Sequence, residues 1–174
     1  QEKIMTTSTP TRRRFAFTLT PIAGQRFQPT GFPDLGAAIY RAPGNQTDDL
    51  LVESSQSMAN HLEATTWDMA RQQPTHAVAD LPYVRVLDGA GDFLTSSRLE
   101  AHRLASAYVL NGKLDDREMK TLLPERFGLV KGKPLNMAQV YRELFTLDPL
   151  SLVHGVFFAQ KWPWQPKVAR AITA

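Results

Sequence analysis

The order of hydrophobic and polar residues predicts a strand and then an irregular loop near the start of the chain. Residues 14–20 alternate large apolar with small side chains, as in a strand with one apolar face, and Pro21 ends the pattern. From Gly24 to Gly36, three glycines and two prolines in thirteen residues favour a shaped loop. The polar residues 1–13 are expected to be a flexible tail.

A helical period replaces this alternation in the middle of the chain. Apolar residues recur every three or four positions from Leu50 to Gln73, which predicts the clearest helix, and Pro74 stops it. A short strand is expected at residues 81–86, directly before a DGAGD turn. Because Pro82 cannot donate a backbone hydrogen bond, this strand should lie at a sheet edge.

Capping signals predict three further helices. The S-x-x-E spacing at residues 97–100 indicates a capping box, and the Asn-Gly pair at 111–112 should end that helix. One of the aspartates at 115–116 is expected to cap a short third helix ending near Pro124. Asn136 precedes a fourth helix with an apolar side.

The last part of the chain predicts a strand and a helix. Residues 151–158 are almost continuously apolar, which suits a strand buried on both faces. The pattern after Pro166 is helical and runs to Ala174 without a cap, so we expect the chain to be the front portion of a longer subunit. Together these elements predict an α/β or α+β fold.

Composition narrows the class of protein. The 174 residues include no cysteine, which excludes thiol catalysis, cysteine-rich metal modules and disulfide scaffolds, and favours a reducing, cytoplasmic setting. No apolar run is long enough for a membrane helix, so no membrane partner is expected. The net charge of +3 divides into +4 for residues 1–44, −6 for 45–92 and +5 for 93–174. Basic blocks of this kind are compatible with a polyanionic partner.

The familiar catalytic signatures are missing from the sequence. It contains no G-x-G-x-x-G, P-loop, G-x-S-x-G or H-E-x-x-H motif, and its four histidines lack ligand spacing. The adjacent aspartates at 48–49 and 115–116 stand at expected helix starts, where capping explains them better than catalysis. We therefore predict no catalytic residue, no metal and no cofactor.

Three polar clusters have the composition of an RNA-contact surface. Arginine offers charge, neutral donors suit phosphate and ribose hydroxyls, and phenylalanine offers a stacking face for an unpaired base. The alternatives are an ordered surface loop for the first cluster, a solvated helix face for the second and simple helix capping for the third. The candidate contacts are Arg26, Phe27, Gln28 and Thr30 in the loop, Ser54, Gln56, Ser57 and Asn60 in the first helix, and Ser97, Arg98, His102 and Arg103 in the second.

Four motifs occur in an order that resembles a known family. They are RFQPTGFPDLGAAIY at 26–40, LLVESSQSMANHLE at 50–63, LTSSRLEAHRLASAYV at 94–109 and LDPLSLVHGVFF at 147–158. Together they resemble the CRISPR-associated backbone subunit of type I-G effectors, formerly type I-U. This subunit belongs to the "Cas seven" family of the RAMP superfamily.

The resemblance implies a fold, a function and partners. The fold would be a hand-shaped, RRM-like (ferredoxin-like) α+β palm over residues 14–174, with helical insertions and an incomplete C-terminus. The subunit would be a non-catalytic protein that polymerises along crRNA, grips its phosphate backbone and presents the guide to target DNA in antiviral defence. Its partners would be crRNA, target DNA through the guide, identical subunits in a filament, other Cascade subunits and a helicase-nuclease.

Two alternatives remain open beside this expectation. Type III backbone subunits, which are related, cleave RNA with an acidic loop residue, and a metal-assisted loop carboxylate such as Asp34 would be the equivalent here. A scaffold or anti-defence protein that only resembles the backbone subunit is the other.

Overall fold

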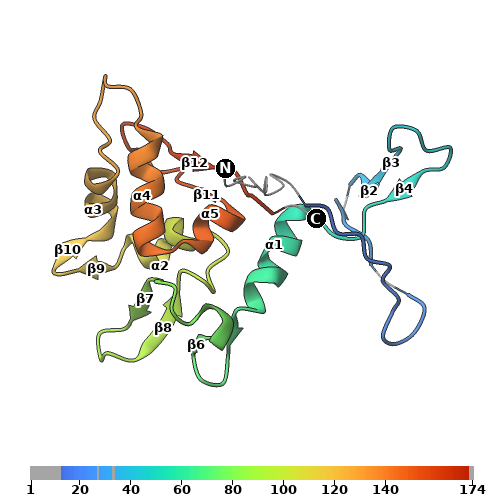
Figure 1. Ribbon diagram of the computed structural model, residues 1–174, viewed down its shortest axis with the longest axis horizontal. Coiled ribbons are helices and arrows are strands. Elements are labelled where there is room, and N and C mark those ends of the chain that lie inside the picture. The colour runs from blue at the N-terminus through green and yellow to red at the C-terminus, as the bar shows by residue number, and fades with distance from the viewer. Residues whose placement is uncertain (1–12, 27, 33, 173–174) are drawn as a thin grey trace, which may run out of the picture. The chain divides into compact units, whose positions relative to one another are not determined.

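The computed structural model describes residues 13–26, 28–32 and 34–172 (Figure 1). The tail expected at 1–13 thus lies, except for residue 13, outside the described residues. The chain divides into two compact units, residues 1–52 and 53–174. The description below takes each unit by itself.

Unit 1 contains two small antiparallel hairpins. Strand β1 (Gly31–Phe32) pairs with β2 (Gly36–Ala37), and β3 (Ile39–Tyr40) pairs with β4 (Asp49–Leu50). Gly36 has φ +73°, a left-handed conformation that lets the chain reverse after the first hairpin turn. The segment from Gly24 to Gly36 is therefore mostly loop, as predicted, with β1 inside it.

The strand predicted at residues 14–20 is wrong in this structure. Residues 13–20 form no regular element, and Phe15, Phe17 and Leu19 are each more than 70% exposed. A segment with an alternating pattern forms a strand only when a neighbouring strand pairs with its backbone N–H and C=O groups. Within the residues that the structure describes, no segment supplies that edge.

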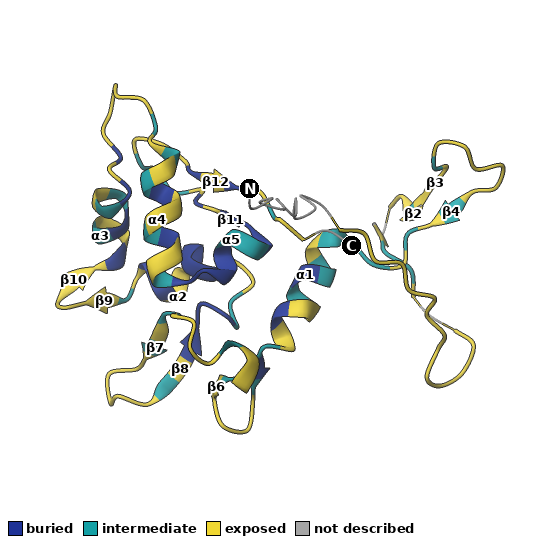
Figure 2. Cartoon of the chain, in the orientation of Figure 1, coloured by how far each residue is buried: buried dark blue, intermediate teal, exposed yellow. Residues whose placement is uncertain are grey.

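Unit 2 is built around a core of helices and one terminal strand pair (Figures 1 and 2). Its helices α2 (Ala107–Leu110), α3 (Met119–Arg126) and α4 (Met137–Leu147) pack with β11 (Val156–Phe157) and β12 (Lys167–Val168). The most deeply buried apolar side chains, at 1% exposure or less, are Leu104, Val109, Leu123, Phe127, Val140, Leu144 and Phe158.

The third and fourth predicted helices are present. Asn136 caps α4, because its side-chain oxygen accepts from the Gln139 backbone N–H at 3.2 Å. Helix α3 also forms, but neither Asp115 nor Asp116 caps it: both adopt positive φ in the turn between β9 (Lys113–Leu114) and β10 (Arg117–Glu118).

The first predicted helix is shorter than its pattern suggests. Helix α1 spans Ser55–Ala64, and the chain then reverses through β5 (Trp67–Asp68) and β6 (Gln73–Pro74). Trp67 is 5% exposed and its ring packs against those of Phe93 and Tyr83. Burying this indole outweighs two more helical turns.

The second predicted helix is largely wrong. Residues 85–87 (β7, Arg85–Leu87) pair with β8 (Phe93–Ser96), and a turn and the short 3-10 helix η2 (Arg103–Ala105) follow before α2. The capping box fails because Glu100 accepts hydrogen bonds from Thr95 and Ser106 at 2.7 Å each. Ser106 caps α2 instead, and α2 does end at Asn111 as predicted.

Near the end of the chain, a helix forms where most of a strand was predicted, and a strand forms where a helix was predicted. Residues 150–154 form α5 (Leu150–His154), so the expected strand is confined to β11. The expected helix after Pro166 is replaced by β12, which pairs with β11 across a nine-residue loop. Together with η1 (His76–Val78), the described residues form a mixed α and β structure of five α-helices and small antiparallel strand pairs. Among them, no helix combines the length and apolarity that crossing a membrane requires.

Candidate functional site

Unit 2 contains an open cleft of about 670 Å³. Its walls come from the first turn of α1, the segment 101–105, the junction of α5 with β11, and β12. Gly155 forms the junction with φ +79°, and a Cβ there would lie 2.8 Å from the Val168 carbonyl oxygen. Only glycine therefore lets the two walls approach so closely.

Positive charge dominates the cleft. Arg103, Lys167 and Arg170 line it together with His102 and His154, and no aspartate or glutamate lies among the lining residues in the described part of the chain. Burial, together with the positive charges of Arg103 and Arg170, lowers the pKa of His154 to about 4. His154 is therefore neutral at pH 7, in a positive local field.

The rim of the cleft carries an aromatic ring beside a cation. Phe157 on β11 is 49% exposed and pairs directly with Lys167 on β12. The Lys167 Nζ lies 5.8 Å from the ring centroid. An exposed ring next to a cation can stack on an unpaired base while the cation meets a phosphate.

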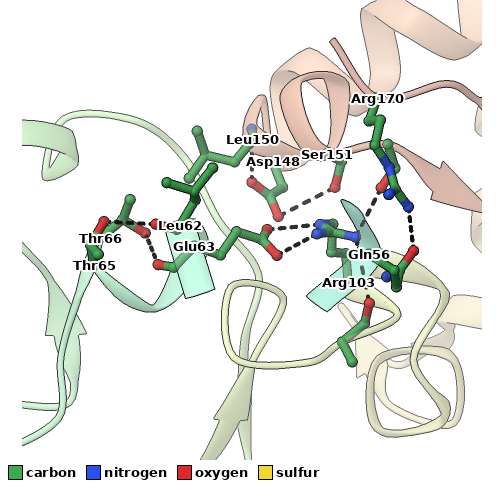
Figure 3. A network of polar contacts seen from close by, with 12 residues as sticks. Gln56, Leu62, Glu63, Thr65, Thr66, Arg103, Asp148, Leu150, Ser151 and Arg170 are labelled. Carbon is green, nitrogen blue, oxygen red and sulfur yellow. Dashed lines mark hydrogen bonds and ion pairs between the residues drawn. The ribbon is translucent and has the colours of Figure 1, made fainter. Parts of the chain in front are cut away.

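Two of the sequence-predicted residues stand exposed at this cleft. Gln56 accepts a hydrogen bond from Arg170, which links the first turn of α1 to the segment that follows β12 (Figure 3). His102 is exposed on the opposite segment. The structure thus brings members of the second and third clusters together at one surface.

Arg103, the third predicted residue at the cleft, is buried in an ion pair. Its Nε and Nη2 donate to Glu63 at 2.8 and 2.5 Å, and its Nη1 donates to the Gly155 carbonyl at 3.1 Å (Figure 3). Both side chains are 4% exposed. Burial raises the pKa of Glu63 to about 7, against the opposing effect of Arg103. Arg103 therefore fastens α1 to the cleft wall with donors that are already engaged.

Arg98 is also buried and engaged within the protein. At 2% exposure it donates to the carbonyls of Val78, Leu81 and Pro82, between 3.0 and 3.3 Å, and lies over the Tyr83 ring. Ser97 is fully buried, and its hydroxyl accepts from the Val84 backbone N–H at 3.1 Å. These two residues hold the segment before the cleft in place.

The remaining helix candidates, Ser54, Ser57 and Asn60, lie away from the cleft. The Ser54 hydroxyl caps α1 by accepting from the Ser57 backbone N–H at 3.1 Å, as an N-cap serine does. Asn60 is half-buried, and its side-chain oxygen is enclosed without a partner. None of the three lines the cleft.

The loop candidates belong to unit 1. Arg26 and Gln28 are exposed, whereas the Thr30 hydroxyl donates to the Val52 carbonyl at 3.0 Å. Phe27 lies outside the described residues. Asp34 is exposed in the turn between β1 and β2. In the part of the chain that the structure describes, no group of three or more histidine, aspartate or glutamate side chains could hold a metal ion.

Sequence reasoning missed Phe157, Lys167 and Arg170. Their place at the cleft depends on the pairing of β11 with β12, and the sequence pattern after Pro166 is helical instead. The only available signal was the basic charge of the third block.

The neutral state of His154 makes stability depend on pH. Its pKa falls from 6.5 to about 4 on folding, so the unfolded chain binds the extra proton and stability is lost as pH falls from 6.5 toward 4. The free energy of unfolding falls by at most about 1.4 kcal/mol per pH unit. The loss between pH 6.5 and 5 is therefore at most about 2 kcal/mol.

The raised pKa of Glu63 has the opposite effect, because it lowers the stability as pH rises from 4.5 to 7. The contribution of His154 is therefore measured by comparing two proteins. Urea unfolding of the unmodified chain and of His154→Gln should show a stability difference that shrinks as pH falls. A difference independent of pH would contradict a neutral buried imidazole.

A charged, acid-free cleft with an exposed ring is typical of proteins that bind nucleic acid. The sequence model of the CRISPR-associated protein GSU0053 family matches residues 14–174. The chain therefore belongs to this family of CRISPR-associated proteins and has a role in CRISPR defence. A comparison with curated proteins found no match.

Proposed function

We propose that this chain is a non-catalytic backbone subunit of a type I-G effector that holds crRNA in the unit 2 cleft. The observation that carries the proposal is the acid-free cleft lined by Lys167, Arg170 and His102. Single-stranded RNA presents a phosphate at every nucleotide, and a cleft with cations and no carboxylates attracts it whatever its sequence. That property suits a subunit whose guide differs from one complex to the next.

The aromatic rim supports a single strand over a duplex. Phe157 is half-exposed beside Lys167, so a base can stack on the ring while its phosphate meets the ammonium group. Bases inside a duplex are already stacked and cannot use such a platform. Gln56 adds a neutral side chain at the same rim, and Arg26 and Gln28 in unit 1 are further proposed contacts.

The assembly proposed around this contact follows from the RNA. Identical subunits would lie side by side on one crRNA within an RRM-like architecture, together with other effector subunits and a helicase-nuclease that cuts. Target DNA would pair with the guide held in this way. The family membership and the positive cleft support this arrangement.

Removing the cleft cations is expected to weaken RNA binding. Lys167→Ala and Arg170→Ala should each lower the affinity for a single-stranded RNA about tenfold, because each loses a charge-assisted contact worth about 1.5 kcal/mol. Each should also reduce the slope of log affinity against log salt by about 0.7. Fluorescence anisotropy across a salt series measures both.

Lys120→Ala and Arg142→Ala are the matched controls, since both residues are exposed helix side chains that do not line the cleft. They should leave affinity and salt slope nearly unchanged. RNA binding that is indifferent to salt, or equally weakened by the control pair, would rule out the cleft as the RNA site.

A further inference from the structure

Two loops of unit 2 meet at one carbonyl oxygen. The Val130 carbonyl, in the loop between α3 and α4, accepts from the Lys133 backbone N–H at 3.1 Å and from the Trp164 indole N–H at 3.2 Å. The first bond closes a tight turn that contains Lys131 and Lys133, and the second ties the β11–β12 loop to that turn. The structure therefore holds Trp164 beside two lysines.

The residues at this meeting point present positive charge and an aromatic ring to solvent. Lys131 and Lys133 are exposed, as is Lys161 in the β11–β12 loop, and none of these lysines forms an ion pair within the described residues. Trp164 is 39% exposed, so its ring can be contacted although its N–H is engaged. Neither loop contains an aspartate or a glutamate. These four residues form a surface that we call the loop patch.

The loop patch adjoins the wall of the cleft. Ala159 and Gln160 line the cleft, and their carbonyls accept from the Gln165 side chain at 3.2 and 3.3 Å. Gln165 is the neighbour of Trp164 in the chain, and Lys161 directly follows Gln160. A strand that leaves the cleft past this wall therefore meets the loop patch next.

The chemistry of the loop patch suits single-stranded RNA. An exposed indole offers a stacking face to any base, and ammonium groups meet phosphates whatever the sequence. Because a hydrogen bond already fixes the indole, little conformational freedom of the ring is lost on binding. We propose that the loop patch binds the nucleotides that adjoin those in the cleft, on the same RNA strand. This inference rests on the proposed function and lengthens the RNA site.

The test is a length series of uridine oligonucleotides of about 4 to 16 nucleotides, the range that single-strand sites cover, bound to the full chain. The double variant Lys131→Ala, Lys133→Ala should bind the longest oligonucleotide about tenfold more weakly than the unmodified chain, and the shortest equally well. Its salt slope with the longest oligonucleotide should fall by about 1.4, because two phosphate contacts are lost. Fluorescence anisotropy measures both quantities.

Trp164 is tested separately from the lysines. Trp164→Phe loses the hydrogen bond to Val130 and keeps an aromatic face, whereas Trp164→Leu loses both. Trp164→Leu should lower the affinity for the longest oligonucleotide about tenfold, and Trp164→Phe should lower it much less, because a ring remains to stack on a base.

Matched controls come from exposed residues outside the cleft and the loop patch. The double variant Lys113→Ala, Arg142→Ala removes two exposed cations, and Phe145→Leu removes a ring that is 61% exposed on α4. Both control proteins should keep the length dependence and the salt slope of the unmodified chain.

The outcomes distinguish this inference from the proposed function. A loss in the Lys131, Lys133 variant that is equal at every length, or no loss at any length, would overturn the inference, while weaker binding in Lys167→Ala would still support the cleft. Equal effects of Trp164→Phe and Trp164→Leu would contradict stacking on the indole and leave it a structural link between the two loops. Absence of salt-dependent binding at every length would overturn the proposed function, and the inference with it.

Discussion

Replacing Arg103 by alanine is expected to destabilise unit 2 by about 3–5 kcal/mol, the largest effect of any single substitution considered. The change removes one partner of a buried ion pair and leaves Glu63, 4% exposed, as a carboxyl group without its guanidinium. It also leaves the Gly155 carbonyl without the donor that lies 3.1 Å away. Chemical denaturation at pH 7.5, followed by tryptophan fluorescence, measures the loss.

A double-mutant comparison separates the ion pair from general packing. Glu63→Leu combined with Arg103→Met removes both charges and should be less destabilised than Arg103→Ala, because no uncompensated group remains. Arg103 also adopts φ +51°, so Arg103→Gly should recover about 1 kcal/mol relative to alanine. A loss below about 1 kcal/mol in Arg103→Ala would mean that the pair is open to solvent.

The sequence predicted well those local elements whose capping residue and capped backbone group lie close together in the chain. Asn136 and the Gln139 N–H that it caps are three residues apart, and α4 follows directly. In contrast, the S-x-x-E spacing at residue 97 competes with Thr95 and Ser106 for the same Glu100 carboxylate. The pairing of β7 with β8 decides that competition, and a capping motif carries no information about this pairing.

At the candidate site, too, local sequence and contacts between residues far apart in the chain determine different things. A clustered arginine predicts a polyanion contact, but whether the side chain is exposed depends on partners elsewhere. Arg103 meets Glu63 across 40 residues of sequence, and Arg98 meets carbonyls 16 to 20 residues away. Conversely, Lys167 and Phe157 form the cleft rim only because β12 pairs with β11. Residue type thus indicated the chemistry, and chain pairing decided which residues present it.

Arg98 offers the clearest separation of a structural arginine from an RNA contact. Replacing it by methionine is expected to destabilise unit 2 by about 3 kcal/mol, since three carbonyls lose a charged donor. A second cause is Asp148: burial raises the pKa of this fully buried carboxyl, and Ser97 and the Arg98 charge offset part of that rise. Without Arg98, Asp148 loses a compensating charge.

The RNA affinity of folded Arg98→Met should nevertheless stay within about twofold of the unmodified chain, because the guanidinium reaches no solvent-facing phosphate position. Arg170→Ala should show the reverse: weaker RNA binding with little change in denaturation midpoint, since Arg170 is only half-buried and donates its hydrogen bond to an exposed glutamine. Measuring stability and anisotropy on the same two proteins therefore assigns each arginine its role. An Arg98→Met protein that keeps its stability and loses RNA binding would return Arg98 to the RNA interface and contradict the burial argued above.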